Sequence, residues 1–489
     1  MKLYNTLSND AQEFAPADGK TVKMYVCGVT PYSSTHVGHA LSYVAFDTLR
    51  RYLEFLGYDV KHVQNFTDVD DKIIQRAQEQ GISPDDLAER YIDDFYRTMD
   101  ALNIQRAHVY PRATQEIGPI LETIQKLIDN GSAYAAAGDV YFRVTKKDDY
   151  GKLSHRTLDG MQAGARIEVD ENKEHPMDFV LWKGAREGEP SWESPWGPGR
   201  PGWHIECTAM SMTYLGATLD IHGGGQDLIF PHHENEIAQS EASTGETPFS
   251  RYWVHNGLLQ LGHDKMSKSL GNLVSVEEAL EQYTPDAIRL YFLSSHYRSP
   301  LSYTDEGCDA MERSADRLRH ALRPGPESAA EPMDPSAFRE QFIAAMDDDL
   351  NTPRALAAIF DLSREMNRQR DEGHSIEKAQ ECLRDLGGLL GLTFQERETT
   401  LSIDAGSFNS LVESLHAQLT GPDQGDLAGL VSATQEVSGQ DIDSLLALRA
   451  SCREHKQYAL ADEIRAWLDA QSISVEDSAG GSTWEYRPS

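Results

Sequence analysis

The sequence predicts an α/β protein whose first domain is built on a doubly wound parallel sheet. Three observations support this prediction. Residues 22–27 are a β-rich run, residues 41–56 carry apolar side chains at helical spacing, and residues 59–64 form a second β-rich run. A strand, a helix and a second strand in this order begin a Rossmann-type sheet. Gly57 follows the helix, at the position where a glycine often ends one.

Later segments divide the chain further. Residues 131–201 interrupt the alternation with a short strand at 140–144 and a stretch rich in Gly, Pro and Trp, so we expect an insertion there. The Pro-containing sequence at 324–335 is typical of a linker. Residues 394–440 are polar and weakly patterned. Helical spacing covers residues 342–367, 376–390 and 442–470.

Composition restricts the class of protein. The 489 residues suffice for about three domains. The sequence shows no run of ~18 apolar residues that would span a membrane, and its start shows no signal peptide. Five scattered cysteines favour a reducing cytoplasm over a disulfide scaffold.

The charge balance is strongly acidic. Lys and Arg number 45 against 78 Asp and Glu, which gives a net charge of −33. This excess opposes loose binding to nucleic acid, although local basic patches remain compatible with such a partner. Two explanations stay open: a surface adapted to high salt, where repulsion is screened, and ordinary drift of surface composition.

A first candidate site lies where the first long helix begins. His36 and His39 are three residues apart, so they share one face of the first turn, and Gly38 between them allows close approach to the backbone. A helix N-terminus suits phosphate, and two imidazoles there could stabilise charge on a phosphate in a transition state. The alternative is a pair of ordinary surface histidines.

A second candidate site is the run Lys-Met-Ser-Lys-Ser at 265–269. Lys265 and Lys268 could grip a polyphosphate as mobile point charges. Alone, such a loop is more often simply solvated. Together, in this order and at this separation, the two motifs resemble the paired signatures of class I aminoacyl-tRNA synthetases, and residues 286–290 resemble the helix that follows the second signature.

A third group of residues has metal-binding chemistry. Cys27 ends the first strand, Cys207 lies in the run Trp-His-Ile-Glu-Cys, and His232 and Glu236 are four apart, so they face the same way on a helix. Two thiolates, an imidazole and a carboxylate can form a zinc site. Because they span some 200 residues, a buried small cysteine and a surface helix pair remain alternatives.

This set resembles the zinc site of the cysteinyl-tRNA synthetase family, and the likeness covers nearly all of residues 24–351. The resemblance implies four metal ligands, Cys27, Cys207, His232 and Glu236. It implies a substrate pocket for cysteine formed by Gly28, Thr67, Trp203 and Asp227. It also implies ATP contacts at His36, Gly38, His39, Gly224 and Lys268, with His36, His39, Lys265 and Lys268 catalytic.

The resemblance also implies three parts: a catalytic domain at 1–300 with its insertion, a stem-contact and helical-bundle region at 301–393, and a small anticodon-binding region at 394–489. Candidate tRNA anticodon contacts are Arg453, Tyr458, Asp462 and Asp477. Tyr458 could stack on a base. A solvated amphipathic helix with a core tyrosine is the alternative.

The activity implied is ATP-dependent ligation of L-cysteine to tRNA(Cys) through cysteinyl-adenylate by a cytoplasmic monomer. Zinc would select the substrate thiolate, because an alcohol is a poor zinc ligand, and Mg²⁺ would accompany ATP. Two alternatives remain. One is a cysteine–aminosugar ligase of the same ancestry, which should lack the anticodon-reading end. The other is a catalytically silent tRNA- or zinc-binding protein.

Overall fold

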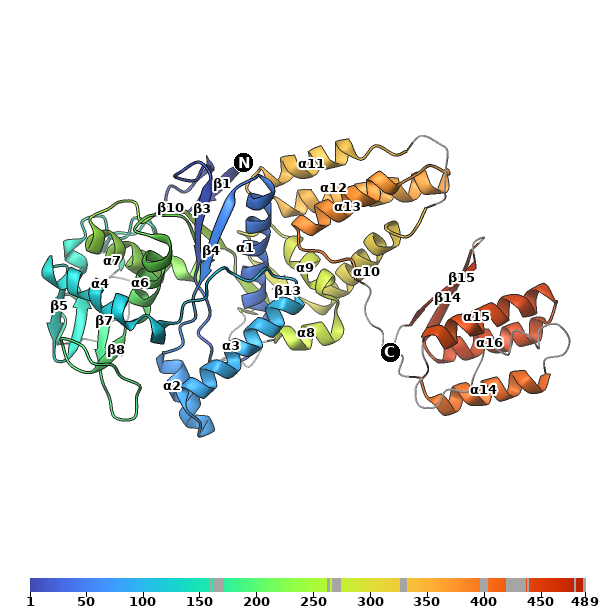
Figure 1. Cartoon of the computed structure of the whole chain (residues 1–489), viewed down its shortest axis with the longest axis horizontal. Helices are drawn as coiled ribbons and strands as arrows, with labels where there is room; N and C mark the ends of the chain where they lie inside the picture. Colours follow the sequence, from blue (N-terminus) through green and yellow to red (C-terminus); the bar gives the residue numbers. More distant parts are fainter. Residues whose placement is uncertain are drawn as a thin grey trace. The chain divides into compact units, whose positions relative to one another are not determined.

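The structure is a computed structural model of the whole chain (Figure 1). It describes all residues except 159, 162–170, 262–263, 266–273, 326–331, 396–402, 419–436, 438, 479–480 and 487–489. Contacts divide the chain into two compact units, Met1–Gln395 and Glu396–Ser489. The division of the first unit near residue 300 stays a prediction. Among the helices described, none has the length and apolar character needed to cross a membrane.

The first unit is organised around a parallel sheet of four strands in the order β10-β9-β3-β4. The strands are β3 (Thr21–Val26), β4 (Asp59–Gln64), β9 (Leu219–Gly225) and β10 (Ser250–Asn256). Helix α1 (Val37–Phe55) covers one face, and α6 (Trp203–Leu215) lies on the other (Figure 1). The chain order reverses between β3 and β9, so a crevice for ligands is expected beyond their carboxyl ends.

The first strand–helix–strand unit follows the sequence prediction closely. Strand β4 has the predicted bounds, and β3 ends one residue before Cys27. Helix α1 begins at Val37, where the first long helix was expected to start, and His36 caps it. Gly57 adopts a left-handed φ of 91°, which ends the helix as predicted.

The insertion forms a separate antiparallel sheet in the order β5-β6-β7-β8. Its strands are β5 (Ala133–Ala136), β6 (Asp139–Phe142), β7 (Phe179–Gly184) and β8 (Gly199–Pro201). The predicted strand at 140–144 is too long at its end, because the chain turns into a 3-10 helix, η2, at Val144–Lys146. Asp178 accepts the Val144 N–H at 2.9 Å and holds this turn.

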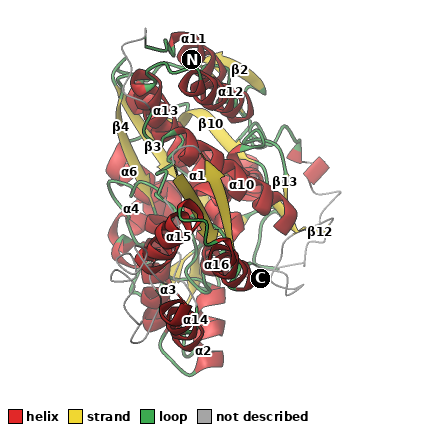
Figure 2. Cartoon of the chain, turned by 90° about the vertical axis from the view of Figure 1, so that its right-hand side faces the viewer, coloured by secondary structure: helices red, strands yellow, loops and turns green. Residues whose placement is uncertain are grey.

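The remaining elements of the first unit are short strands and a larger set of helices, drawn in yellow and red in Figure 2. The strands are β1 (Lys2–Asn5), β2 (Asp10–Glu13), β11 (Leu259–Leu261), β12 (Asp264–Lys265) and β13 (Leu301–Tyr303). The helices before the site are α2 (Asp71–Gln80), α3 (Pro84–Ala101), η1 (Ala113–Gln115) and α4 (Ile117–Asp129). Those after β9 are η3 (Gln226–Leu228), η4 (Ile229–His233), α7 (Glu234–Thr244), α8 (Val276–Gln282), α9 (Pro285–Leu293), α10 (Asp305–Ala321), α11 (Ser336–Met346), α12 (Thr352–Asp371) and α13 (Glu377–Leu389).

The helical spacing predicted at 342–367 is present as two helices, because the chain breaks between α11 and α12. Asp349 and Leu350 take left-handed φ values of 55° and 52°. The Asp349 carboxylate accepts the Tyr4 N–H at 2.8 Å and the Arg298 Nε–H at 2.8 Å, which fixes the turn. Asn351 then caps α12 ahead of Pro353, a sequence signal for a helix start.

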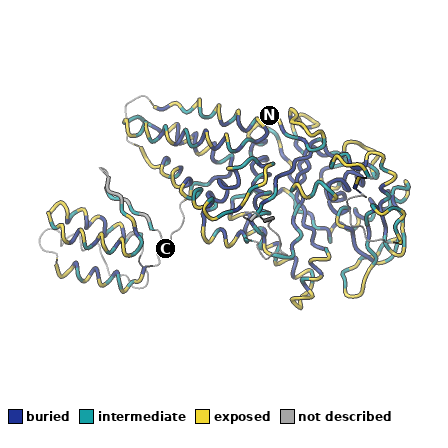
Figure 3. The backbone as a smooth tube through the Cα atoms, turned by 180° about the vertical axis from the view of Figure 1, so that it is seen from behind, coloured by how far each residue is buried: buried dark blue, intermediate teal, exposed yellow. Residues whose placement is uncertain are grey.

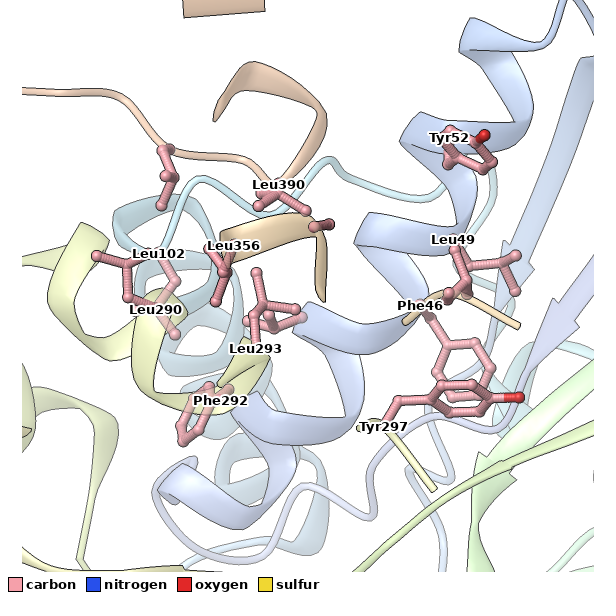
Figure 4. Packing of buried hydrophobic residues seen from close by; sticks show 14 of the residues in the cluster. Phe46, Leu49, Tyr52, Leu102, Leu290, Phe292, Leu293, Tyr297, Leu356 and Leu390 are labelled. Atoms are coloured by element: carbon pink, nitrogen blue, oxygen red, sulfur yellow. The ribbon is translucent and has the colours of Figure 1, made fainter. Parts of the chain in front are cut away.

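A buried ion pair ties α1 to α9 inside the main apolar core. Figure 4 shows Phe46, Leu49 and Tyr52 of α1 in the same cluster as side chains of α9, and Figure 3 shows the buried interior in dark blue. Within this core Arg289 donates to the Asp47 carboxylate at 2.6 Å and to the Leu390 carbonyl at 2.8 Å. Both side chains of the pair are fully buried. Burial opposes the charge of Asp47, but Arg289 and Arg51 outweigh it and lower the pKa of Asp47.

Replacing Asp47 by asparagine should lower the free energy of unfolding of the first unit by about 3–5 kcal/mol, because the buried guanidinium of Arg289 loses its counter-charge. Urea unfolding followed by tryptophan fluorescence measures this. Glu79→Gln is the matched control, because the Arg76–Glu79 pair at 3.0 Å is exposed and should change stability by less than about 1 kcal/mol. Equal effects of the two substitutions would contradict the role given to the buried pair.

The second unit contains α14 (Ala405–Gln418), α15 (Gly439–Glu454), α16 (Tyr458–Ala470) and a hairpin of β14 (Ile473–Ser478) and β15 (Gly481–Tyr486). The helical spacing predicted at 442–470 is present as two helices, separated at Lys456, which has a φ of 62°. Helix α14 lies in the stretch described as weakly patterned. Its buried residues Phe408, Leu411, Val412 and Leu415 have helical spacing, which was the missed signal.

Candidate active site and metal centre

Four predicted metal ligands meet beyond the carboxyl ends of β3 and β9. Cys27 follows β3 and its N–H binds the Gly223 carbonyl at 3.0 Å. Cys207 points from α6, while His232 lies just before α7 and Glu236 in its first turn. Residues 180 positions apart are therefore brought to the crevice at the point where the strand order reverses.

The geometry of this group suits a metal ion. One ligand atom from each of Cys27, Cys207, His232 and Glu236 lies within 4.8 Å of the others, and all four residues are buried. The two Sγ atoms are 3.9 Å apart, and Cys27 Sγ is 3.7 Å from Glu236 Oε1. A tetrahedral zinc with usual bond lengths has ligand–ligand distances of about 3.3–3.8 Å. Two sulfurs, one nitrogen and one carboxylate oxygen form a donor set that zinc accepts.

Charges within the group support one another. Burial disfavours the charge of His232, but Glu236 at 3.0 Å and Cys207 outweigh it and raise the pKa of His232 to about 10. Burial is likewise overcome at Glu236, where His222 and His232 lower the pKa to about 2. The hydrogen bond with Cys27 lowers the pKa of Cys207 to about 6, whereas burial raises the pKa of Cys27. The group therefore favours a carboxylate at Glu236 and a thiolate at Cys207.

Further histidines surround the ligands, and the sequence prediction missed them. His204 Nδ1 lies 2.9 Å from His232 Nδ1, so the other ring nitrogen of His232 faces Glu236. His233 Nε2 is 3.3 Å from Cys27 Sγ, and its Nδ1 is 2.8 Å from His255. Cys27, His222, His233 and Glu236 form a second overlapping set of possible ligands. The adjacent pair His232 and His233 was the available sequence signal.

The two histidines of the first signature stack on each other at the start of α1. Their ring centroids are 3.6 Å apart, and His36 Nδ1 accepts the His39 N–H at 3.3 Å. Nε2 of a neutral His36 therefore carries its proton and can donate to a ligand. Burial lowers the pKa of His36 to about 4, and burial with the neighbouring His36 lowers the pKa of His39 well below its usual range. Both rings are neutral hydrogen-bond donors at pH 7.

The two signatures approach each other through the backbone. The Val37 N–H binds the Val274 carbonyl at 3.0 Å, and the Val276 N–H binds the Thr35 carbonyl at 2.9 Å. The chain directly after the lysine-rich loop is thus paired with the start of α1. Lys265 lies in the short strand β12, whereas Lys268 lies outside the described residues.

The predicted cysteine pocket lies beside the metal group. The Gly28 N–H binds Asn65 Oδ1 at 2.9 Å, and Asn65 Nδ2 donates to Thr67 Oγ1 at 3.2 Å. A Cβ at Gly28 would lie 1.6 Å from the Asn65 carbonyl oxygen, so this position requires glycine. Trp203 is 41% exposed and stacks on His232 at 4.3 Å, which makes it a wall beside the metal group. Asn65 was missed by the sequence prediction.

Two other predicted contacts have different surroundings. Asp227 is exposed in η3, directly after β9. The run His222–Gly225 forms the end of β9. A Cβ at Gly224 would lie 2.8 Å from Leu228 and 3.0 Å from the His233 ring, so packing within the protein also requires glycine there. Nucleotide contact at Gly224 stays a prediction.

The predicted anticodon contacts lie in the second unit. Tyr458 begins α16 and is 57% exposed, and Asp462 follows one turn later on the same side, also exposed. Arg453 lies in the last turn of α15, and Asp477 lies in β14. These positions leave the ring of Tyr458 open to stacking.

The fold and the two signatures are those of a class I aminoacyl-tRNA synthetase. The family described as tRNA synthetases class I (C) catalytic domain matches residues 13–313, and the DALR domain family matches residues 341–395. Among solved structures, the Mycobacterium tuberculosis methionyl-tRNA synthetase in complex with methionyl-adenylate is similar in fold. Its TM-score is 0.57 at 18% identity, over 84% of this chain and 94% of that chain.

Curated relatives narrow the class. The cysteine–tRNA ligase of Dehalococcoides mccartyi is 54% identical over 100% of both chains, and that of Geobacter metallireducens is 45% identical over 100% of both. The chain belongs to the cysteine–tRNA ligase family, also called cysteinyl-tRNA synthetases. The predictions of a class I fold and of an aminoacyl-tRNA synthetase are confirmed.

Proposed function

We propose that this enzyme ligates L-cysteine to tRNA(Cys) with ATP, and that a zinc ion on Cys27, Cys207, His232 and Glu236 selects cysteine by its thiolate. The observation that carries the zinc proposal is the buried group of four donors within 4.8 Å of one another at the switch point of the sheet. Bound zinc would supply a soft Lewis acid that takes a thiolate and discriminates against the hydroxyl of serine. Packing alone separates such near-isosteres poorly.

The reaction proceeds in two steps. The cysteine carboxylate attacks the α-phosphorus of ATP, which gives cysteinyl-adenylate and releases pyrophosphate. A terminal ribose hydroxyl of tRNA(Cys) then attacks the adenylate carbonyl, which gives cysteinyl-tRNA and releases AMP. In the first step the neutral His36 and His39 donate hydrogen bonds to the α-phosphate as its charge develops. Lys265 and Lys268 hold the pyrophosphate side, and Mg²⁺ accompanies ATP.

The substrate is oriented by residues beside the metal group. Trp203 walls the cysteine side chain, and the hydrogen-bonded series Gly28, Asn65 and Thr67 forms a fixed polar floor. Asp227 takes the ammonium group, because it is an exposed carboxylate directly after β9. The nucleotide is contacted by His36, His39, Gly38 and Gly224. Such positioning supplies much of the rate acceleration in a reaction of this kind.

The second unit recognises the anticodon of tRNA(Cys). Tyr458 stacks on an anticodon base, and Arg453, Asp462 and Asp477 bind base edges. The exposed ring of Tyr458 supports this assignment. The enzyme works as a monomer in the cytoplasm, where ATP and tRNA are available. The full-length match to cysteine–tRNA ligases disfavours both the aminosugar ligase and a silent binding protein.

Cysteine-dependent exchange between ATP and labelled pyrophosphate tests the activation step, with serine as the control amino acid and zinc measured on the same sample. We expect exchange with cysteine, none with serine, and about one zinc per chain. Addition of tRNA(Cys) should then yield cysteinyl-tRNA. Folded protein that holds zinc and shows no exchange would contradict the proposed activity, and exchange by metal-free protein would contradict the role of zinc.

A further inference from the structure

The helix that supplies the candidate ligand Glu236 also holds the insertion. Glu236 in the first turn of α7 faces the metal group together with His233, which lies just before the helix. The residues between them face the other way: Glu234 is 1% exposed and Asn235 is 2% exposed, and both contact residues 150–154 of the insertion. We call residues 150–154 the anchor segment.

The Glu234 carboxylate accepts three backbone N–H groups of the anchor segment. Oε1 accepts the Gly151 N–H at 2.9 Å. Oε2 accepts the N–H groups of Leu153 at 3.1 Å and Ser154 at 2.8 Å. Three backbone donors on one buried carboxylate define a position for it much more narrowly than one flexible contact would, because charge-assisted hydrogen bonds are strong and directional.

One further contact and a tight turn fix the anchor segment in place. Tyr150 donates its hydroxyl proton to Asn235 Oδ1 at 2.5 Å. Gly151 has a left-handed φ of 99°, and a Cβ there would lie 2.0 Å from the Arg156 carbonyl oxygen, so the turn has one tight shape. The anchor segment therefore forms a rigid surface on which the start of α7 is held.

We propose that Glu234 is a positioning residue for the metal centre: by fixing the first turn of α7 on the anchor segment, it sets where His232 and Glu236 stand relative to Cys27 and Cys207. The proposal rests on the zinc site of the proposed function. Groups outside the ligand shell commonly orient metal ligands, and their loss typically weakens metal binding about 10- to 100-fold.

Glu234→Gln tests this with little change in volume. An amide has one acceptor oxygen, so it keeps the contacts to Leu153 and Ser154 only by turning its NH₂ toward the Gly151 N–H. One backbone donor then faces another donor inside the protein. We expect zinc affinity, measured by competition with a chromogenic chelator, to fall about 10- to 100-fold. In cobalt-substituted protein we expect the ligand-field bands to shift.

Glu241→Gln is the matched control. Glu241 lies on the same helix two turns further on, is 5% exposed, and accepts from Lys147 at 2.7 Å and Lys152 at 2.6 Å of the same insertion. Its loss should weaken attachment of the insertion and leave zinc affinity and the cobalt spectrum unchanged within about threefold. Tyr150→Phe, which removes the contact to Asn235 alone, should shift zinc affinity in the same direction as Glu234→Gln by a smaller factor.

The outcomes separate the two proposals. Wild-type protein without zinc would overturn the proposed zinc site itself. Zinc-binding wild type with an unchanged affinity and cobalt spectrum in Glu234→Gln would overturn the positioning role alone. Equal losses in Glu234→Gln and Glu241→Gln would also overturn it, because they would indicate general loosening of the insertion. If Glu234→Gln does not fold, Tyr150→Phe tests the attachment through which Glu234 is proposed to act: an unchanged zinc affinity there overturns the proposal that the contact between α7 and the anchor segment sets the ligand positions.

Discussion

Replacing Cys207 by serine should abolish stoichiometric zinc binding and lower cysteine activation by on the order of 10³-fold or more, which is about 4 kcal/mol of transition-state stabilisation. The serine hydroxyl nearly preserves the shape of the side chain and removes the thiolate that zinc binds well. The ligand atoms of Cys207, Cys27, His232 and Glu236 lie within 4.8 Å of one another, and no described cysteine besides Cys27 and Cys207 belongs to either possible ligand set. Metal analysis and ATP–pyrophosphate exchange measure the two effects.

Cys308→Ser is the control, because Cys308 is equally buried and lies in α10, outside both possible ligand sets. It should retain one zinc per chain and full cysteine activation. Thermal unfolding adds an independent readout, since a metal that binds only the folded state stabilises it. A chelator should lower the melting temperature of wild type and of Cys308→Ser but leave Cys207→Ser unchanged. A Cys207→Ser protein that keeps zinc and activity would refute the ligand assignment.

Local signals were sufficient for the elements nearest the nucleotide signature. The bounds of β4 and the end of α1 just before Gly57 followed from β-rich runs, apolar spacing and a glycine after the helix, all of which act within a few residues. The break between α11 and α12 was only partly accessible. Asn351 and Pro353 mark the start of α12 in the sequence, but Asp349 stabilises the turn before it through Tyr4 and Arg298, which are distant in sequence and are brought there by the tertiary structure.

In the metal centre, too, some features follow from local sequence signals and others depend on the tertiary structure. His232 and Glu236 share a face at a spacing that the sequence displays, and the structure places them 3.0 Å apart. Their meeting with Cys27 and Cys207 depends on the strand order of the sheet, which spacing alone does not determine; the family resemblance supplied it. The roles of His204 and His255 could not be predicted, because each acts through another histidine rather than through a motif.

Glu234 illustrates a third case. Its neighbours His232 and Glu236 suggested a ligand-bearing helix, and a glutamate beside them would ordinarily be taken as a further ligand or a solvated charge. The structure turns it away from the metal group onto three backbone N–H groups of the insertion. A sequence pattern shows which side chains are present, but backbone N–H groups occur at almost every residue and leave no mark in the sequence. The contact between Glu234 and these N–H groups could therefore be recognised only from the structure.

Replacing His39 by alanine should lower the rate of adenylate formation about 10²- to 10³-fold, because one preorganised donor to the α-phosphate is removed. The zinc content should stay at one per chain and the KM for cysteine should change little, since His39 lies outside both ligand sets. His39→Asn retains a side-chain N–H donor and should recover part of the lost rate. Pre-steady-state measurement of adenylate formation separates this effect from product release.

The pH profile distinguishes neutral donors from cations at this position. The pKa of His36 is about 4, and the pKa of His39 is also lowered by burial, so both rings gain a proton only in acid. Neutral donors are therefore fully present above about pH 5, and adenylate formation should not decline between pH 6 and pH 8 through loss of histidine charge. An imidazolium with an ordinary pKa near 6.5 would instead lose its charge, and its contribution, across that interval. A tenfold fall in rate from pH 6 to pH 8 that disappears in His39→Asn would show that the charged ring acts.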